Sequence, residues 1–175
     1  MKRPQRESPA RTPAAQTDLG CACAKARQAA RVLTQLYDSR LRGAGIEAPQ
    51  FGLLMTLQKR GPCSQAALGR RYALDKTTVS RNLRLLERNG WIAFSETDDR
   101  RERQVTLTPA GRRLVASAKP EWKKAQEALR SAMTGKQWDA MFQAFNTVIR
   151  AAQESQRQTT QRARKRVVRR RQLAT

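Results

Sequence analysis

The spacing of the apolar residues changes after Gly90 from that of a helix to that of strands, and this change restricts the fold more than any other feature of the sequence. In residues 75–90, apolar residues recur three and four positions apart, which is the spacing of one helix face. The two segments that follow, 91–96 and 104–108, are typical of strands: the first is rich in aromatic and apolar residues, and the second alternates polar and apolar residues. Only polar and charged residues lie between them. The sequence therefore predicts a helix followed directly by a β-hairpin.

A shorter helix is predicted just before this one. Ser64 is a suitable N-terminal cap for a helix from Gln65 to about Tyr72. Asp75 can cap the next helix, and Gly90 is suited to ending it. Two helices joined by a tight break and followed by a hairpin make a winged helix-turn-helix.

Further helices flank this motif, and caps, prolines and glycines mark their ends. Pro120 lies inside one of them, so we expect a kink or a break there. These helices are predicted over residues 21–42, from Pro49 to before Gly61, from Pro109 onward, and after Thr134. The predicted fold is mainly α with a small β-hairpin wing.

The charge of the chain points to a polyanionic partner. It has 36 Lys and Arg against 14 Asp and Glu, a formal net charge of +22. Residues 21–156 alone hold 24 basic and 12 acidic residues, so the predicted folded part is itself basic. Nucleic acid is the first candidate and an anionic membrane surface the second. We expect residues 1–18 and 157–175 to be disordered basic arms, the second with eight basic residues and no acidic one.

Composition also argues against several classes of protein. The chain has no histidine, which excludes Ser-His-Asp and Cys-His catalysis and His-bearing metal sites. Its three cysteines give no disulfide framework or zinc site, and no apolar run is long enough to span a membrane. No secretory signal is visible. We therefore expect a cytoplasmic protein without metal or cofactor that is not an enzyme.

Four stretches of the sequence resemble the MarR family of bacterial transcription regulators: PQF at 49–51, DKTTVSRNL at 75–83, LERNGWI at 86–92 and, most specifically, DDRRERQVTLTPAG at 98–111. The resemblance covers about residues 21–153. It implies a triangular homodimer in which 19–45 and 112–156 form dimerisation helices and 46–111 form the DNA-binding winged helix. Such a dimer would bind a pseudo-palindromic operator on double-stranded DNA, with half-sites about one helical turn apart.

The resemblance and the helix phase together assign roles in DNA contact. The helix beginning at residue 76 would enter the major groove, and the hairpin would reach the minor groove. The amino end of the short first helix would bind a phosphate through its amides. Phosphate contacts give affinity and register, whereas base contacts give sequence specificity. The predicted base readers are Thr77, Thr78 and Arg81; the predicted phosphate contacts are Ser64, Gln65, Lys76, Ser80, Arg84, Arg100 and Arg103; in the wing, Arg101 would insert into the minor groove and Asp99 would orient it.

Cys21 and Cys23 allow two interpretations. Some members of the family sense organic hydroperoxides through a cysteine near the start of the first long helix, and Lys25 and Arg27 would favour a reactive thiolate here. Alternatively, both are small, inert residues buried at a dimer interface. Cys63 is expected in the core. The resemblance also allows a small aromatic or carboxylate effector between the dimer helices and the winged domain.

These observations favour a transcriptional regulator, expected to be a homodimeric repressor released by an effector or by thiol oxidation. It would associate with the bacterial nucleoid. The alternative is an architectural protein that coats DNA with little sequence preference, which the basic tails favour and the specific string at 75–83 disfavours.

Overall fold

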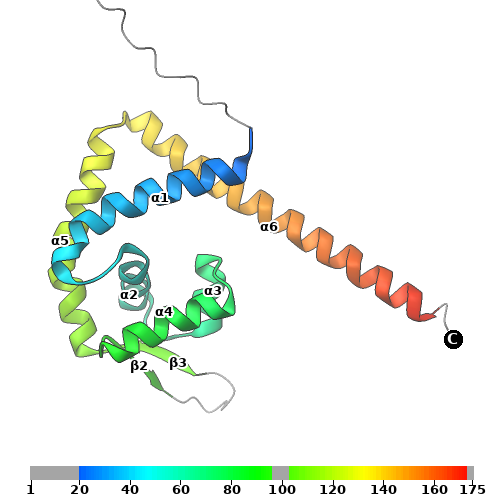
Figure 1. The fold of residues 1–175 in the computed structure, drawn as a ribbon, viewed down its shortest axis with the longest axis horizontal. Coiled ribbons are helices and arrows are strands. Elements are labelled where there is room, and N and C mark those ends of the chain that lie inside the picture. The colour runs from blue at the N-terminus through cyan, green and yellow to red at the C-terminus, as the bar shows by residue number, and fades with distance from the viewer. Residues whose placement is uncertain (1–19, 96–102, 173–175) are drawn as a thin grey trace, which may run out of the picture.

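The structure is a computed structural model that describes residues 20–95 and 103–172, with side chains as far as residue 163. The predicted arm 1–18 lies outside the described residues. In Figure 1 a winged helix-turn-helix body lies below one long helix, a second long helix runs down its left side, and a third projects to the right. The elements are α1 (Ala22–Leu41), the 3₁₀ helix η1 (Arg42–Ala44), α2 (Ala48–Arg60), β1 (Cys63–Ser64), α3 (Gln65–Tyr72), α4 (Lys76–Arg88), β2 (Ile92–Ser95), β3 (Gln104–Leu107), α5 (Pro109–Ser131) and α6 (Gly135–Gln172).

The wing rests on a three-stranded antiparallel sheet in the order β1-β3-β2, where the sequence predicted only two strands. The additional strand, β1, places Cys63 opposite Val105 and Ser64 opposite Gln104. A strand of two residues is too short to show an alternating pattern, so only the tertiary pairing reveals it. It joins the start of α3 to the base of the wing.

The core lies where α2, α4 and the sheet meet α1 and α5. Phe51 of α2 is fully buried, and its ring centroid lies 6.3 Å from that of Trp122 in α5. Val79, Leu83 and Leu86, the apolar residues on one face of α4, are all buried. The largest fully buried side chains are Leu41, Phe51, Leu53, Leu54, Leu68, Val79, Leu83, Leu86, Val105 and Val115.

Helix α5 continues through Pro120, so of the two expected outcomes, a kink or a break, the break does not occur. Proline removes the amide that would bond to the carbonyl four residues earlier, which normally weakens a helix. Here Ala118 and Ala125 are buried on either side of the proline, and the Tyr37 hydroxyl of α1 donates a hydrogen bond to Gln126. Packing against α1 therefore supports α5 across the lost hydrogen bond.

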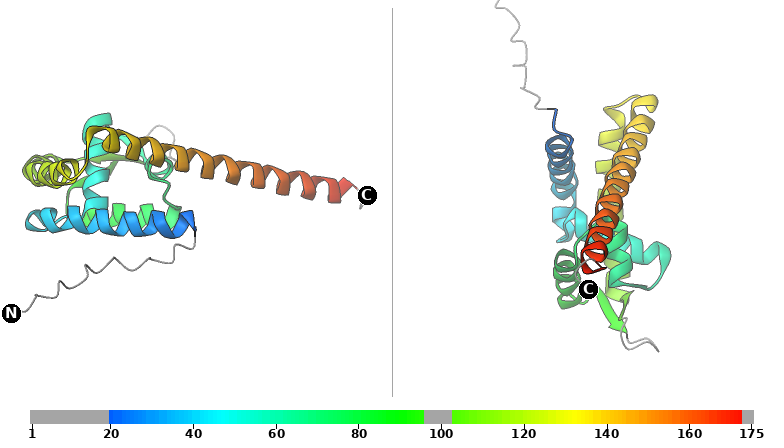
Figure 2. Two further views of the ribbon diagram at one scale, coloured as in Figure 1. Left: turned by 90° about the horizontal axis from the view of Figure 1, so that it is seen from above. Right: turned by 90° about the vertical axis from the view of Figure 1, so that its right-hand side faces the viewer.

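Helix α6 begins with a capping box, in which the Gln137 amide donates to Thr134 Oγ1 at 3.2 Å and the Thr134 amide donates to Gln137 Oε1 at 2.8 Å. It then runs to Gln172 without interruption and projects from the body (Figure 2). The prediction that residues 157–175 are disordered is therefore wrong as far as Gln172. Arg, Gln, Lys and Ala all have high helix propensity, and neither Gly nor Pro follows Gly135.

Candidate nucleic-acid interface

The first turn of α4 is fixed by its cap. Asp75 Oδ1 accepts the Thr78 amide at 2.8 Å, and Asp75 Oδ2 accepts the Thr78 hydroxyl at 2.6 Å. These bonds, the hydroxyl first, hold the pKa of Asp75 below its usual value. The carboxylate therefore stays charged at neutral pH and anchors the end of the helix that was predicted to enter DNA.

This cap changes the expected role of Thr78. The threonine hydroxyl has a single proton, and that proton is donated to Asp75. Thr78 is also only half exposed. Its hydroxyl is therefore committed to the cap as a donor, and Thr77 and Arg81 are the predicted base readers whose side chains are exposed.

The buried face of α4 orients its opposite face outward. Because Val79, Leu83 and Leu86 pack into the core, the residues between them on the helix surface face solvent. One cation that the sequence prediction omitted, Arg88, follows Arg81 by seven positions, and this spacing signals the same face. The exposed residues away from the buried face include Lys76, Thr77, Arg81, Arg84 and Arg88, together with the acidic Glu87, and Ser80 is half-buried.

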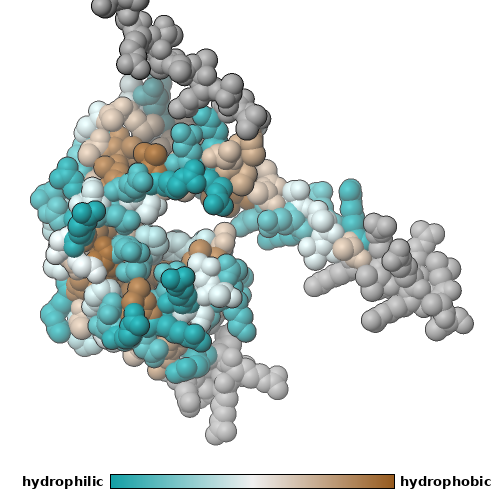
Figure 3. All heavy atoms as spheres, viewed as in Figure 1, coloured by the Kyte–Doolittle hydropathy of each residue, from teal (hydrophilic) through white to brown (hydrophobic). Residues whose placement is uncertain are grey.

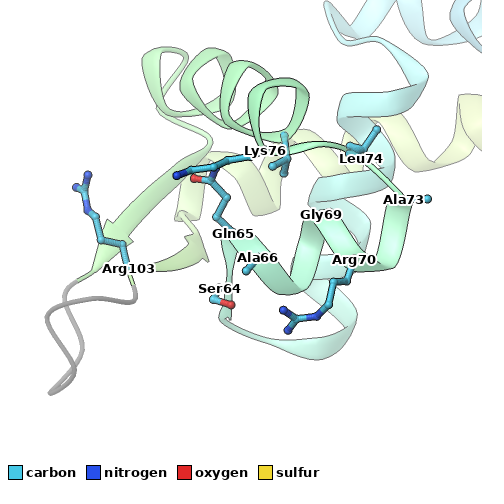
Figure 4. Close-up of a pocket in the computed structure, with 10 residues that line it drawn as sticks. Ser64, Gln65, Ala66, Gly69, Arg70, Ala73, Leu74, Lys76 and Arg103 are labelled. Carbon is cyan, nitrogen blue, oxygen red and sulfur yellow. The ribbon is translucent and has the colours of Figure 1, made fainter. Parts of the chain in front are cut away.

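A cavity of about 600 Å³ lies between α3, the start of α4 and Arg103 at the tip end of β3 (Figure 4). It brings together four predicted phosphate contacts from three parts of the sequence. It also holds Arg70 of α3, which the sequence prediction missed because its place depends on how α3 packs against α4. The polar and charged lining residues are Ser64, Gln65, Arg70, Lys76 and Arg103.

Two local contacts hold the edges of this cavity. Ser64 Oγ accepts the Ala67 amide at 3.3 Å and caps α3, as predicted. At the wing, the Arg103 guanidinium lies 4.7 Å from the centroid of the Phe94 ring. This cation–π contact positions a positive charge directly before β3, at the end of the strand next to the wing tip. Asp99, Arg100 and Arg101 lie outside the described residues, so their roles stay predictions.

A tight junction connects α4, the wing and α5. Thr108 Oγ1 donates to the Gly90 carbonyl at 2.7 Å and accepts the Gly111 amide at 3.0 Å, while the Thr108 amide donates to the Trp91 carbonyl at 3.1 Å. Gly111 is buried directly against that Trp91 carbonyl. The orientation of α4 and the wing relative to α5 therefore depends on this junction.

The three cysteines lie apart from the exposed face of α4. Cys21 and Cys23 are exposed at the start of α1 in this single chain. Cys63 is half-buried against the core, and burial raises the pKa of its thiol. Within the described residues, no group of three or more His, Cys, Asp or Glu could hold a metal ion, and no helix is long and apolar enough to cross a membrane.

Comparisons of the sequence and the fold with known proteins agree with the winged helix-turn-helix described above. A MarR family model matches residues 44–102. The HTH-type transcriptional regulator YwoH of Bacillus subtilis is 31% identical over 81 residues, which are 46% of this chain and 59% of YwoH. The chain therefore spans about three-fifths of the length of that curated relative.

Solved structures match over more of the chain. The M. tuberculosis transcriptional regulator MosR, in complex with DNA, superposes with a TM-score of 0.70 and 29% identity, covering 76% of this chain and 96% of MosR. A probable transcriptional regulator from Pseudomonas aeruginosa gives a TM-score of 0.66 and 25% identity, covering 73% of this chain and 96% of its own.

Proposed function

This chain belongs to the MarR family, and from that premise we propose that it is a homodimeric transcriptional repressor that binds a pseudo-palindromic DNA operator through α4 and the wing. The observation that carries the proposal is the exposed face of α4, with its three arginines, beside the cavity lined by Gln65, Lys76 and Arg103. The relatives are transcriptional regulators rather than enzymes, which confirms the prediction that this chain is not an enzyme. Acting on the nucleoid, it would work in the bacterial cytoplasm.

The proposed contacts follow from groove dimensions. A helix fits the major groove of B-DNA, about 12 Å wide, and reads the edges of the bases there. Thr77 and Arg81 of α4 would contact bases, whereas Lys76 and Arg84 would contact phosphates. Ser80 and Thr78 are half-buried, so we assign them minor roles. The α3 amino end and Arg103 would bind the backbone beside the groove.

Replacing Arg81 tests the base-reading role of α4. We expect Arg81→Ala to weaken binding to the preferred duplex by about 1–3 kcal/mol and to relax specificity at one base-pair position. The preferred duplex is first selected from a random-sequence library with the wild-type chain, and affinity is then measured for every single-base variant. Lys123→Ala, an exposed charge on α5, is the control and should change affinity less than about twofold. Equal weakening on all sequences would contradict the assignment.

The homodimer is supported by apolar side chains that one chain leaves uncovered. Phe142, Phe145, Val148 and Ile149 of α6 and Val32 of α1 are 38–60% exposed. Figure 3 shows hydrophobic surface over the first half of α6. Large apolar patches on a protein surface commonly mark interfaces. A second copy of α1 and α6 would cover them, and its two-fold axis would set two α4 helices about 34 Å apart.

Release by a small aromatic acid is supported by a second cavity, of about 220 Å³, between α2, α3 and α5. Phe51, Tyr72 and Trp122 line it together with the cations Lys59 and Arg71. The Tyr72 hydroxyl donates to the Gly52 carbonyl at 2.6 Å and lies 2.6 Å from Thr56 Oγ1, so this hydroxyl is held in place. Aromatic walls with nearby cations suit a flat anion.

The release assay measures loss of the selected duplex by fluorescence anisotropy as benzoate is added. We expect release with the wild type and at least about tenfold weaker response with Arg71→Gln, since one charge opposite a carboxylate is worth about 1.4 kcal/mol or more. An organic hydroperoxide in place of benzoate, with a Cys21→Ser/Cys23→Ser control, tests the thiol route. Indifference to both reagents would contradict the proposed release.

A further inference from the structure

The second half of α6 differs in chemistry from the first. We call residues 153–172 the distal arm. The apolar side chains that suit a dimer interface end at Ala152, and the arm contains only Ala163, Val167 and Val168 as apolar residues. Eight of its residues are Arg or Lys, against one acidic residue, Glu154. The arm therefore has no apolar face to bury against protein and carries a dense positive charge.

The arm is helical although its charges repel one another. Like charges four positions apart, such as Arg162 with Arg166 and Lys165 with Arg169, destabilise an isolated helix. A polyanion placed along the arm would remove this repulsion. A membrane surface fits less well, because helices that lie in a membrane interface bury a broad apolar face.

The structure connects the arm to the cavity at the DNA-binding face. A cavity of about 640 Å³ separates α3 from α6, and Arg70 lines it opposite Gln153, Gln156 and Arg157. Arg70 also lines the 600 Å³ cavity that holds Gln65 and Lys76. Positive and polar side chains therefore form a continuous row from Arg103 of the wing, past Arg70 of α3, to Arg157 of the arm. Beyond that point the arm projects away from the body and descends to about the level of α4 (Figure 1).

We propose that the distal arm is a second phosphate-binding element, which contacts the backbone of DNA that flanks the base pairs read by α4. This inference rests on the proposed DNA binding. Twenty helical residues extend about 30 Å, the length of roughly nine base pairs. Arg157 and Arg162, which are both exposed, would make the contacts nearest the body.

The test compares two duplexes that differ only in length. One contains the selected site alone, and the other adds fifteen base pairs on each side. We measure their affinities for the full chain at several salt concentrations. We expect the wild type to prefer the extended duplex at least about tenfold at low salt. The slope of log affinity against log salt should also be steeper on the extended duplex, by about 0.9 per additional phosphate neutralised.

The matched variants remove two charges each. Arg157→Gln/Arg162→Gln keeps helix-forming residues and should reduce the preference for the extended duplex at least threefold, with short-duplex affinity within about twofold of wild type. Lys119→Gln/Lys123→Gln on α5 removes the same charge and should leave the preference unchanged. Circular dichroism checks that the helix content of both variants equals that of the wild type.

The other possible results of this experiment separate a failure of the further inference from a failure of the proposed function. Equal wild-type affinity for the two duplexes, or an equal loss with the α5 control, would overturn the inference but leave the proposed function standing. If the arm variant lost affinity only for phosphatidylserine vesicles, a membrane role would replace it. A wild-type chain that bound neither duplex would overturn the proposed function and this inference together.

Discussion

Replacing Gly111 with alanine is expected to destabilise the fold by about 3 kcal/mol, near the upper end for overpacked sites. A Cβ at this position would lie 2.1 Å from the Trp91 carbonyl oxygen and 2.8 Å from Leu107 Cδ1. That carbonyl accepts the Thr108 amide, so it cannot move without breaking the junction between the wing and α5. The measurement is urea unfolding, read as a shift in midpoint at unchanged slope.

Gly135→Ala is the matched control for this variant. Among the described residues, no atom outside the neighbouring residues and the backbone of α6 itself lies within 4 Å of the added Cβ at Gly135, which begins α6. Alanine there should stabilise the chain slightly, by about 0.4–1 kcal/mol, because it restricts the unfolded state. A Gly111→Ala chain with the midpoint of the wild type would contradict the packing at the junction.

A charge on the apolar face of α6 is expected to have the largest effect on DNA binding. Ile149 is 51% exposed in one chain, and in the proposed dimer it would be covered by the partner. Ile149→Glu should therefore give a single-chain species in sedimentation velocity, because an unpaired buried carboxylate is costly. A single chain could contact only one half-site, so its affinity for the full operator should be about 10²–10⁴-fold weaker than that of the dimer.

Gln143→Glu is the control for this second variant. Residue 143 lies about 120° around α6 from Ile149 by helix phase, outside the apolar face, and it is exposed. This variant should sediment and bind DNA as the wild type does. If Ile149→Glu remained a dimer, the α6 face would not be the interface.

The sequence predicted those elements that have a local signal. Ser64 and Asp75 were expected to cap helices, and each side chain accepts the hydrogen bond of a cap. A capping residue acts within three positions of the helix start, so local sequence is enough to place it. The wing strands were also found within one or two residues, because the composition of the first and the alternation of the second are short-range signals.

What could not be predicted depends on distant parts of the chain. Strand β1 exists only because Val105, 42 positions from Cys63, pairs with it. The place of Arg70 in the α3–α4 cavity depends on helix packing, and α5 continues through Pro120 because α1 lies against it. For residues 157–172, net charge predicted disorder whereas helix propensity favoured the helix that forms.

In the candidate site, too, features with a local sequence signal were predicted, and features that depend on side-chain contacts were not. Helix phase separated exposed Arg81 and Arg84 from the buried face correctly, because α4 is strongly amphipathic. It could not show that the Thr78 hydroxyl is donated to Asp75, since that bond depends on side-chain rotamers. The wing tip residues Asp99, Arg100 and Arg101 lie outside the described residues, and their DNA contacts remain to be measured.

Hydroxyl-radical footprinting of the wild-type chain on genomic DNA that includes its own upstream region tests the central claim most directly. A sequence-specific dimer should protect a few short sites, each a pseudo-palindrome with two halves about one helical turn apart. Protection spread evenly along the DNA, and lost everywhere as salt is raised, would contradict the account and identify an architectural DNA-coating protein.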